Sequence, residues 1–339
     1  MTGASLAAMS NYEQLAWRES LRRLNESPSK AASPASIRKR VGSAKRAVSA
    51  SAGEYLPVET LQSIVSGVMN GTLELTFNPA LRTADAERAF RALQKKHRSL
   101  DQLEDLKQLD VRELDRFRRR KGAYVTTSAV QGAGTSLAVT GSVVSTTVSA
   151  GVASGTVVAA VALDTVASLA VMGRSVGAVA VRYGYDVRLP EEELFAMGVL
   201  SLGVAGSLEA KHTALAALSR LSQQMMRRAT WKQLNEQVLV RTIARVYQML
   251  GLKLTQRKLA QVVPFVGVGI NAALSANMTR HVYQRAEDVY RVRFLSEKYG
   301  LDPLDWVESA SGRDHRTPVR GEIDVAELLQ EELGASEAQ

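Results

Sequence analysis

The sequence predicts an all-α protein, a multi-helix bundle, on two observations. Apolar side chains recur at helical spacing through most of the charged part of the chain. Two long runs, Gly122 to Leu163 and Leu259 to Thr279, contain no Asp, Glu, Lys or Arg at all. As one continuous helix, the first run would be about 60 Å long, twice the hydrocarbon core of a bilayer. We therefore expect it to fold back on itself.

The first uncharged run is built from small residues. Gly, Ala, Ser, Thr and Val dominate it, and leucine occurs only at Leu137 and Leu163. Small side chains allow helix backbones to approach closely. We predict a central Gly/Ala/Ser-rich apolar helical hairpin with a break between Gly132 and Gly141. Two alternatives stay open: the hairpin could be the centre of a soluble helical domain, and Val and Thr also favour β-strands.

The chain as a whole is basic and lacks cysteine. It has 339 residues, a formal charge of +9 and no Cys. A basic excess favours anionic partners, either membrane surfaces or nucleic acid, and the absence of thiols excludes disulfides and thiolate metal sites. No signal peptide is visible, so we expect any membrane contact from the cytoplasmic side. We predict three regions: a basic, partly disordered extension (1–54), a helical domain (55–300) and an acidic, partly disordered tail (301–339).

The first region contains two short helical patterns. A helix is predicted over 11–25, followed by a linker with Pro28 and Pro34. Apolar residues at helical spacing over 37–48 then oppose a basic side that includes Arg38, Lys39 and Arg40. Such a helix can lie on an anionic bilayer. A solvated tail is the alternative.

Charged helices precede the first uncharged run. We predict one over 56–77, one beginning at Thr83 or Asp85, and one over 101–121 that ends in a basic block. A positive flank of this kind is typical of the cytoplasmic side of a membrane-dipping segment. The block contains Arg118, Arg119 and Arg120.

The helical pattern resumes after Asp164. Gly184 is the expected end of the next helix, and Pro190 with three following glutamates predicts the start of another. Two amphipathic helices follow over 207–260. Pro264 predicts that the second uncharged run is a kinked apolar helix, and further helices are expected over 281–299 and 325–333.

Enzymatic motifs are weak. Gly173 to Gly177 spells G-x-S-x-G around Ser175, and Asp186 and His212 follow in the order of an α/β-hydrolase triad. The motif lies within a helical pattern, however, so helix packing through its glycines is favoured. The histidines lack metal-ligand spacing, and GAGTS at 132–136 lacks the lysine of a phosphate-binding loop. We therefore expect no metal and no cofactor, and assign no catalytic residue.

Several polar residues stand in apolar surroundings, where burial requires a partner. Structural ion pairing is one explanation, for example between Asp186 and Arg291 or Arg293. A ligand pocket is the other. Its candidate lining residues are Asp164, Arg174, Tyr183, Tyr185, Asp186, Asn271, Glu287 and Arg291.

A series of short segments resembles the EcsC family, named after the third product of a bacterial operon that also encodes an ABC transporter. They span about residues 100 to 300 and are DRFRRR from Asp115, VQGAGT from Val130, AVRYGYD from Ala180, PEEE from Pro190, VPFVGVGINA from Val263 and YRVRFLSEKYG from Tyr290. The resemblance implies a helical, cytoplasmic or membrane-peripheral protein that is associated with transporters by name, without an established activity.

Taken together, these features predict a membrane-associated helical binding or accessory protein at the inner face of the cell membrane. Membrane lipids and transporter subunits are the expected partners. Two other functions stay open. One is a soluble hydrolase that uses Ser175 or the Asp164 and Asp186 carboxylates. The other is nucleic-acid binding through residues 37–48, although membrane lipids are favoured over nucleic acid as the partner.

Overall fold

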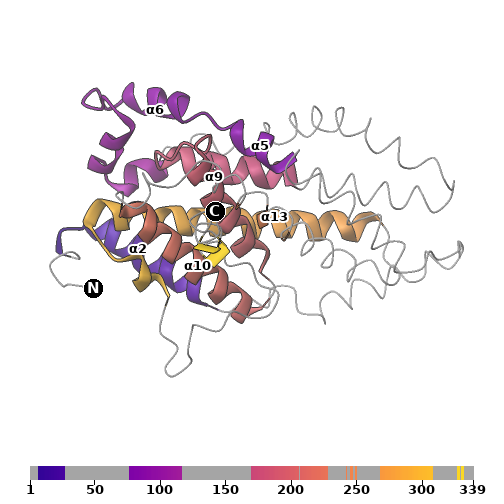
Figure 1. The fold of residues 1–339 in the computed structure, drawn as a ribbon. Helices are drawn as coiled ribbons and strands as arrows, with labels where there is room; N and C mark the ends of the chain where they lie inside the picture. Colours follow the sequence, from indigo (N-terminus) through magenta and orange to yellow (C-terminus); the bar gives the residue numbers. More distant parts are fainter. Residues whose placement is uncertain are drawn as a thin grey trace, which may run out of the picture.

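The computed structural model describes residues 7–26, 76–116, 169–205, 207–227 and 268–307, with side chains of the last range from 279 onward, and a few positions near 245 and 330. Within these ranges every regular element is a helix, which confirms the all-α prediction (Figure 1). The first uncharged run and residues up to 267 of the second, including Pro264, lie outside them. So do the predicted helix over 37–48 and residues 56–75 of the helix predicted over 56–77.

The longest described helix, α13 (Val268–Tyr299), runs through the middle of the bundle (Figure 1). It packs against α9 (Pro190–Val204) and α2 (Asn11–Asn25), and α10 (Leu208–Met226) packs on α9 and on the short helix η3 (Pro303–Trp306). The last twelve residues of the second uncharged run are the first part of α13. That run and the charged segment that follows it therefore share one helix.

Local signals fix several helix ends. Ser10 caps α2, because its Oγ accepts from the Glu13 amide at 3.2 Å while the Glu13 carboxylate accepts from the Ser10 amide. The helix over 169–182 ends where Gly184 has φ of 86°, a left-handed conformation that costs glycine little. Pro190 begins α9, as predicted.

The segment between 85 and 116 differs from the prediction. Asp85 does cap a helix, α6 (Ala86–Gln94), but that helix stops at Gln94. The single helix expected over 101–121 is wrong in its described part: a 3-10 helix, η2 (Leu103–Gln108), is followed by a separate helix over 111–116. The physical reason is local capping, because Asp110 Oδ1 accepts from the Arg112 amide at 2.7 Å and so starts a new helix after η2.

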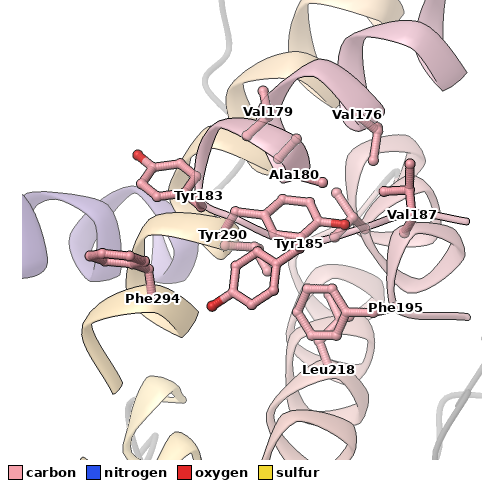
Figure 2. Packing of buried hydrophobic residues seen from close by; sticks show 14 of the residues in the cluster. Val176, Val179, Ala180, Tyr183, Tyr185, Val187, Phe195, Leu218, Tyr290 and Phe294 are labelled. Atoms are coloured by element: carbon pink, nitrogen blue, oxygen red, sulfur yellow. The ribbon is translucent and has the colours of Figure 1, made fainter. Parts of the chain in front are cut away.

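Aromatic side chains fill the contact between α13, α9 and the end of the 169–182 helix (Figure 2). Tyr290 lies 5.6 Å from Tyr185 and 5.3 Å from Phe195, measured between ring centroids. Tyr183 lies 5.6 Å from Phe294 in the same way. Pairs at these distances stabilise a core beyond their buried area, and this core fixes the position of α13.

Among the described residues, no helix combines the length and the apolar character that a membrane span requires.

Candidate functional site

The C-terminal half of α13 carries charged residues that lie inside the protein rather than on its surface. Glu287, Asp288, Arg291 and Arg293 are each at most 7% exposed. A buried charge is costly unless it is paired. Each of these four has an ion-pair partner from another helix or segment.

One group of charges, which we call the anchor cluster, consists of Asp115, Arg182, Glu287 and Arg291. Arg291 Nη2 donates to both oxygens of Asp115, at 3.0 and 3.1 Å, and Arg182 donates to Glu287. Glu287 and Arg291 are one helical turn apart, with 3.9 Å between their closest charged atoms. The cluster thus joins the end of the 111–116 helix and the end of the 169–182 helix to one turn of α13.

The cluster keeps its arginines charged. Burial acts to lower the pKa of Arg182, but the adjacent Glu287 carboxylate outweighs it and the pKa is raised. Arg291 behaves in the same way, with burial opposed by the Asp115 and Glu287 carboxylates, and its pKa is raised. The Tyr183 hydroxyl, which has no hydrogen-bond partner in the described part of the chain, has its pKa raised to about 12 by burial. It is therefore a neutral phenol at physiological pH.

A second group surrounds Arg293. Its Nη1 and Nη2 donate to Glu192 of α9 at 2.7 and 2.6 Å, and its Nε donates to Glu297 at 2.9 Å. The guanidinium lies 4.0 Å from the ring centroid of Tyr185 and 4.3 Å from that of Phe195. This bidentate, stacked geometry suits arginine and cannot be reproduced by lysine.

A third group holds the C-terminus of α2. Lys211 Nζ donates to the backbone oxygens of Arg23, at 2.9 Å, and of Glu26. Arg285 also donates to the Arg23 oxygen, and His212 Nε2 lies 3.3 Å from the Asn25 oxygen. Basic groups are favourable at a helix C-terminus, where backbone oxygens lack intrahelical donors.

An open pocket of about 380 Å³ lies beside α2, over the anchor cluster. Asp115 and Arg291 form its polar part together with Glu19 and Arg23, and Tyr12 Oη donates to Asp115 Oδ2 at 2.7 Å. Its apolar part is formed by Tyr12, Leu15 and Ala16. Its arginines and carboxylates are already paired with one another, so the pocket offers shape and polarity rather than a free charged group.

Comparison with known families decides what kind of protein carries this arrangement. The model of the EcsC protein family matches residues 20–295, which is most of the chain. The chain belongs to the EcsC protein family. No curated protein and no solved structure matches it.

The α13 charges of this EcsC protein include two of the residues predicted to line a pocket. Glu287 and Arg291 are in the anchor cluster with Tyr183 beside them, whereas Tyr185 lies at the Arg293 group. Arg174 lies on the 169–182 helix. Asp164, the side chain of Asn271, and the expected membrane contacts lie outside the described residues; the latter are Arg38, Lys39, Arg40, Arg118, Arg119 and Arg120.

Asp186 makes a local contact. Its Oδ1 accepts from the Arg188 amide at 3.1 Å, in the turn before α9. The carboxylates bound to Arg291 and Arg293 are instead Asp115, Glu192, Glu287 and Glu297.

Sequence reasoning missed Asp115, Glu192 and Glu297 as partners of the buried arginines. The sequence contained one indication of these partners: over 285–298, charged residues occur on every side of the helix, not on one side alone. An amphipathic helix is expected to turn its apolar side, here Val282, Val289 and Leu295, inward and its charged side toward water. Only the packing of α2, α9 and the 111–116 helix around it reverses that reading.

Ser175 is part of a helix, not of a strained turn. It is 4% exposed, and its Oγ donates to the Met172 oxygen at 2.8 Å. The glycines on either side serve helix packing, as predicted: a Cβ on Gly173 would lie 2.6 Å from the Phe77 oxygen, and one on Gly177 would lie 2.6 Å from the Leu81 oxygen. The elbow of an α/β-hydrolase is not formed at this position.

The described residues also contain no group of three or more His, Asp or Glu side chains arranged to hold a metal ion.

Proposed function

We propose that this protein is a membrane-associated binding protein that works at the cytoplasmic face of a membrane without catalysing a reaction. The observation that carries the proposal is the distribution of charge along α13. Residues 280–299 contain all the charges of the helix, and its first twelve residues, VGINAALSANMT, contain none.

The two parts of α13 belong to one continuous helix. The charged part is held in the bundle by the Asp115, Arg182 and Glu192 pairs. At Gly203 of α9 the two helices approach closely, because a Cβ at this position would lie 2.7 Å from Val282 Cγ2. The uncharged part, about 18 Å long at 1.5 Å per residue, extends beyond α9 and α10 in Figure 1.

A rigid base with an uncharged helical end is suited to partial insertion into a bilayer. The free energy of insertion comes from burial of apolar surface, and the paired charges stay with the base, so they need not enter the lipid. The long run from Gly122 to Leu163 is uncharged as well, and in the sequence it begins seven residues after Asp115 of the anchor cluster. Lipid is therefore the first partner we propose, with a transporter subunit as the second.

The absence of cysteine permits a direct test. A single Leu274→Cys substitution, labelled with an environment-sensitive fluorophore, places a probe in the uncharged part of α13. Leu304→Cys, at an exposed position on η3, is the matched control. On addition of vesicles we expect the emission of the probe at 274 to shift to the blue and that of the probe at 304 to stay unchanged.

Cosedimentation of the unlabelled chain with the same vesicles gives an independent measure. A protein that stays in the supernatant at low salt, with no spectral change at position 274, would overturn the proposal. Circular dichroism of both labelled variants shows whether the helical fold is retained.

A further inference from the structure

One exposed surface of the described chain carries five basic side chains, of which Arg91 alone has a carboxylate within ion-pair distance in the described residues. It is formed by α6 and the turn after it. Arg88, Arg91 and Lys95 recur at spacings of three and four residues and therefore share one side of the helix, opposite the buried Ala86, Phe90 and Leu93. Lys96 and Arg98 are exposed in the following turn. We call these five basic residues the α6 cationic surface.

The turn is held in a defined conformation. Gln94 Nε2 donates to the Leu100 oxygen at 2.8 Å, and the amides of Lys96 and His97 donate to the Leu93 oxygen at 2.9 and 3.0 Å. Leu93 and Leu100 are each 1% exposed. The basic side chains are thus presented from a packed base.

Nearby carboxylates are engaged elsewhere. Asp85 caps α6 and lies 3.5 Å from Arg188, and Asp105 accepts from the backbone of its own turn. Glu87 approaches Arg91 at 3.8 Å in a largely exposed pair, which contributes little. Within the described residues, Arg88, Lys95, Lys96 and Arg98 have no carboxylate within ion-pair distance.

We propose that the α6 cationic surface binds the anionic head groups of a lipid bilayer. This inference rests on the proposed membrane association and names the surface that makes the electrostatic contact. Two observations favour a bilayer over nucleic acid. Residues 86–98 expose no Phe, Tyr or Trp ring on which a base could stack, since Phe90 is buried. In addition, α6 lies at the edge of the described helices (Figure 1), where a flat surface can reach it.

The test compares two triple variants with the same loss of charge. Lys95→Gln, Lys96→Gln and Arg98→Gln together remove part of the α6 cationic surface. The matched control replaces Arg18, Arg22 and Arg112, which are exposed on α2 and on the 111–116 helix, by Gln. Both are measured by cosedimentation with phosphatidylcholine vesicles, with and without phosphatidylserine.

Each basic residue near an anionic membrane strengthens binding about fivefold. We therefore expect the α6 variant to bind phosphatidylserine vesicles about a hundredfold more weakly than the unmodified chain, and the control variant to keep most of its affinity. Added salt should reduce the difference, because it screens exposed charges. Equal losses in the two variants, or no dependence on phosphatidylserine, would overturn the inference.

A single-stranded RNA oligomer provides the other arm. Loss of RNA binding in the α6 variant, with vesicle binding unchanged, would assign the surface to nucleic acid and overturn the lipid inference. The probe at position 274 separates the two proposals. If the α6 variant sediments as well as the unmodified chain and keeps the blue shift at position 274, the proposed function holds and the inference about the α6 cationic surface fails. If sedimentation depends on α6 but the probe at position 274 shows no shift, the electrostatic contact holds and insertion of α13 fails.

Discussion

Replacement of Arg293 by methionine is the most direct test of how the buried charges hold α13. The arginine is 3% exposed and binds Glu192 through two hydrogen bonds and Glu297 through a third. Methionine fills similar space but leaves Glu192, itself 6% exposed, without its cation. Glu297 keeps Lys107 at 2.8 Å.

The expected cost follows from that difference. Removing one partner of a buried pair lowers the free energy of unfolding by about 3–5 kcal/mol, and loss of the stacking on Tyr185 and Phe195 adds to it. Adding Glu192→Gln should restore part of the loss, because it removes the uncompensated charge. The two substitutions are therefore expected to be strongly non-additive.

Acid should partly rescue the single variant. Burial already raises the pKa of Glu192 above its ordinary value of 4.5, against the opposing effect of Arg293, and loss of Arg293 raises it further. The folded variant then binds a proton that the unfolded chain does not, so its stability increases as the pH falls from 7 toward 4.5.

Urea unfolding followed by circular dichroism, at neutral and mildly acidic pH, measures both effects. The unmodified chain, Arg293→Met and the double variant are compared under the same conditions. A cost below about 1 kcal/mol for Arg293→Met, or a cost that does not shrink in acid, would refute the reasoning that the pair is buried and compensated.

Three further results are expected. Burial, together with the nearby Arg285, lowers the pKa of Lys211 from 10.5 to about 7. Between these values the unfolded chain holds a proton that the folded chain has released, so urea unfolding should show stability rising with pH and a flatter slope in Lys211→Met. Gly177→Ala should cost about 1–3 kcal/mol, because its Cβ would meet the Leu81 oxygen; equal melting temperatures would contradict this. Ser175→Ala should leave labelling by a serine-reactive fluorophosphonate unchanged, and loss of labelling would revive the hydrolase alternative.

Several helix ends were accessible from local chemistry. The capping box at Ser10 and Glu13, the glycine at Gly184 and the proline at Pro190 each act through neighbours within a few residues. The helix predicted over 11–25 and the boundaries predicted at Gly184 and Pro190 are confirmed for this reason. The same local chemistry also broke the helix expected over 101–121, where Asp110 caps a new helix instead of continuing the previous one.

The pairing of charges was not accessible in this way. Asp115 and Arg291 are far apart in the chain, as are Glu192 and Arg293, and no local rule relates them. The sequence suggested that Glu287 and Arg291 could share a site with Tyr183, and the structure places all three together. It could not name Asp115 and Arg182, which complete the anchor cluster.

By itself, the sequence determined that this protein is helical and where several helices begin and end, because capping and periodicity depend on residues close in the chain. It also determined the family, through the order and spacing of its segments. Only the tertiary structure decided that the charged half of α13 is buried, since that depends on which helices surround it. The difference is physical: a charge is stabilised by water or by a partner, and the chain must fold before it is known which of the two is present.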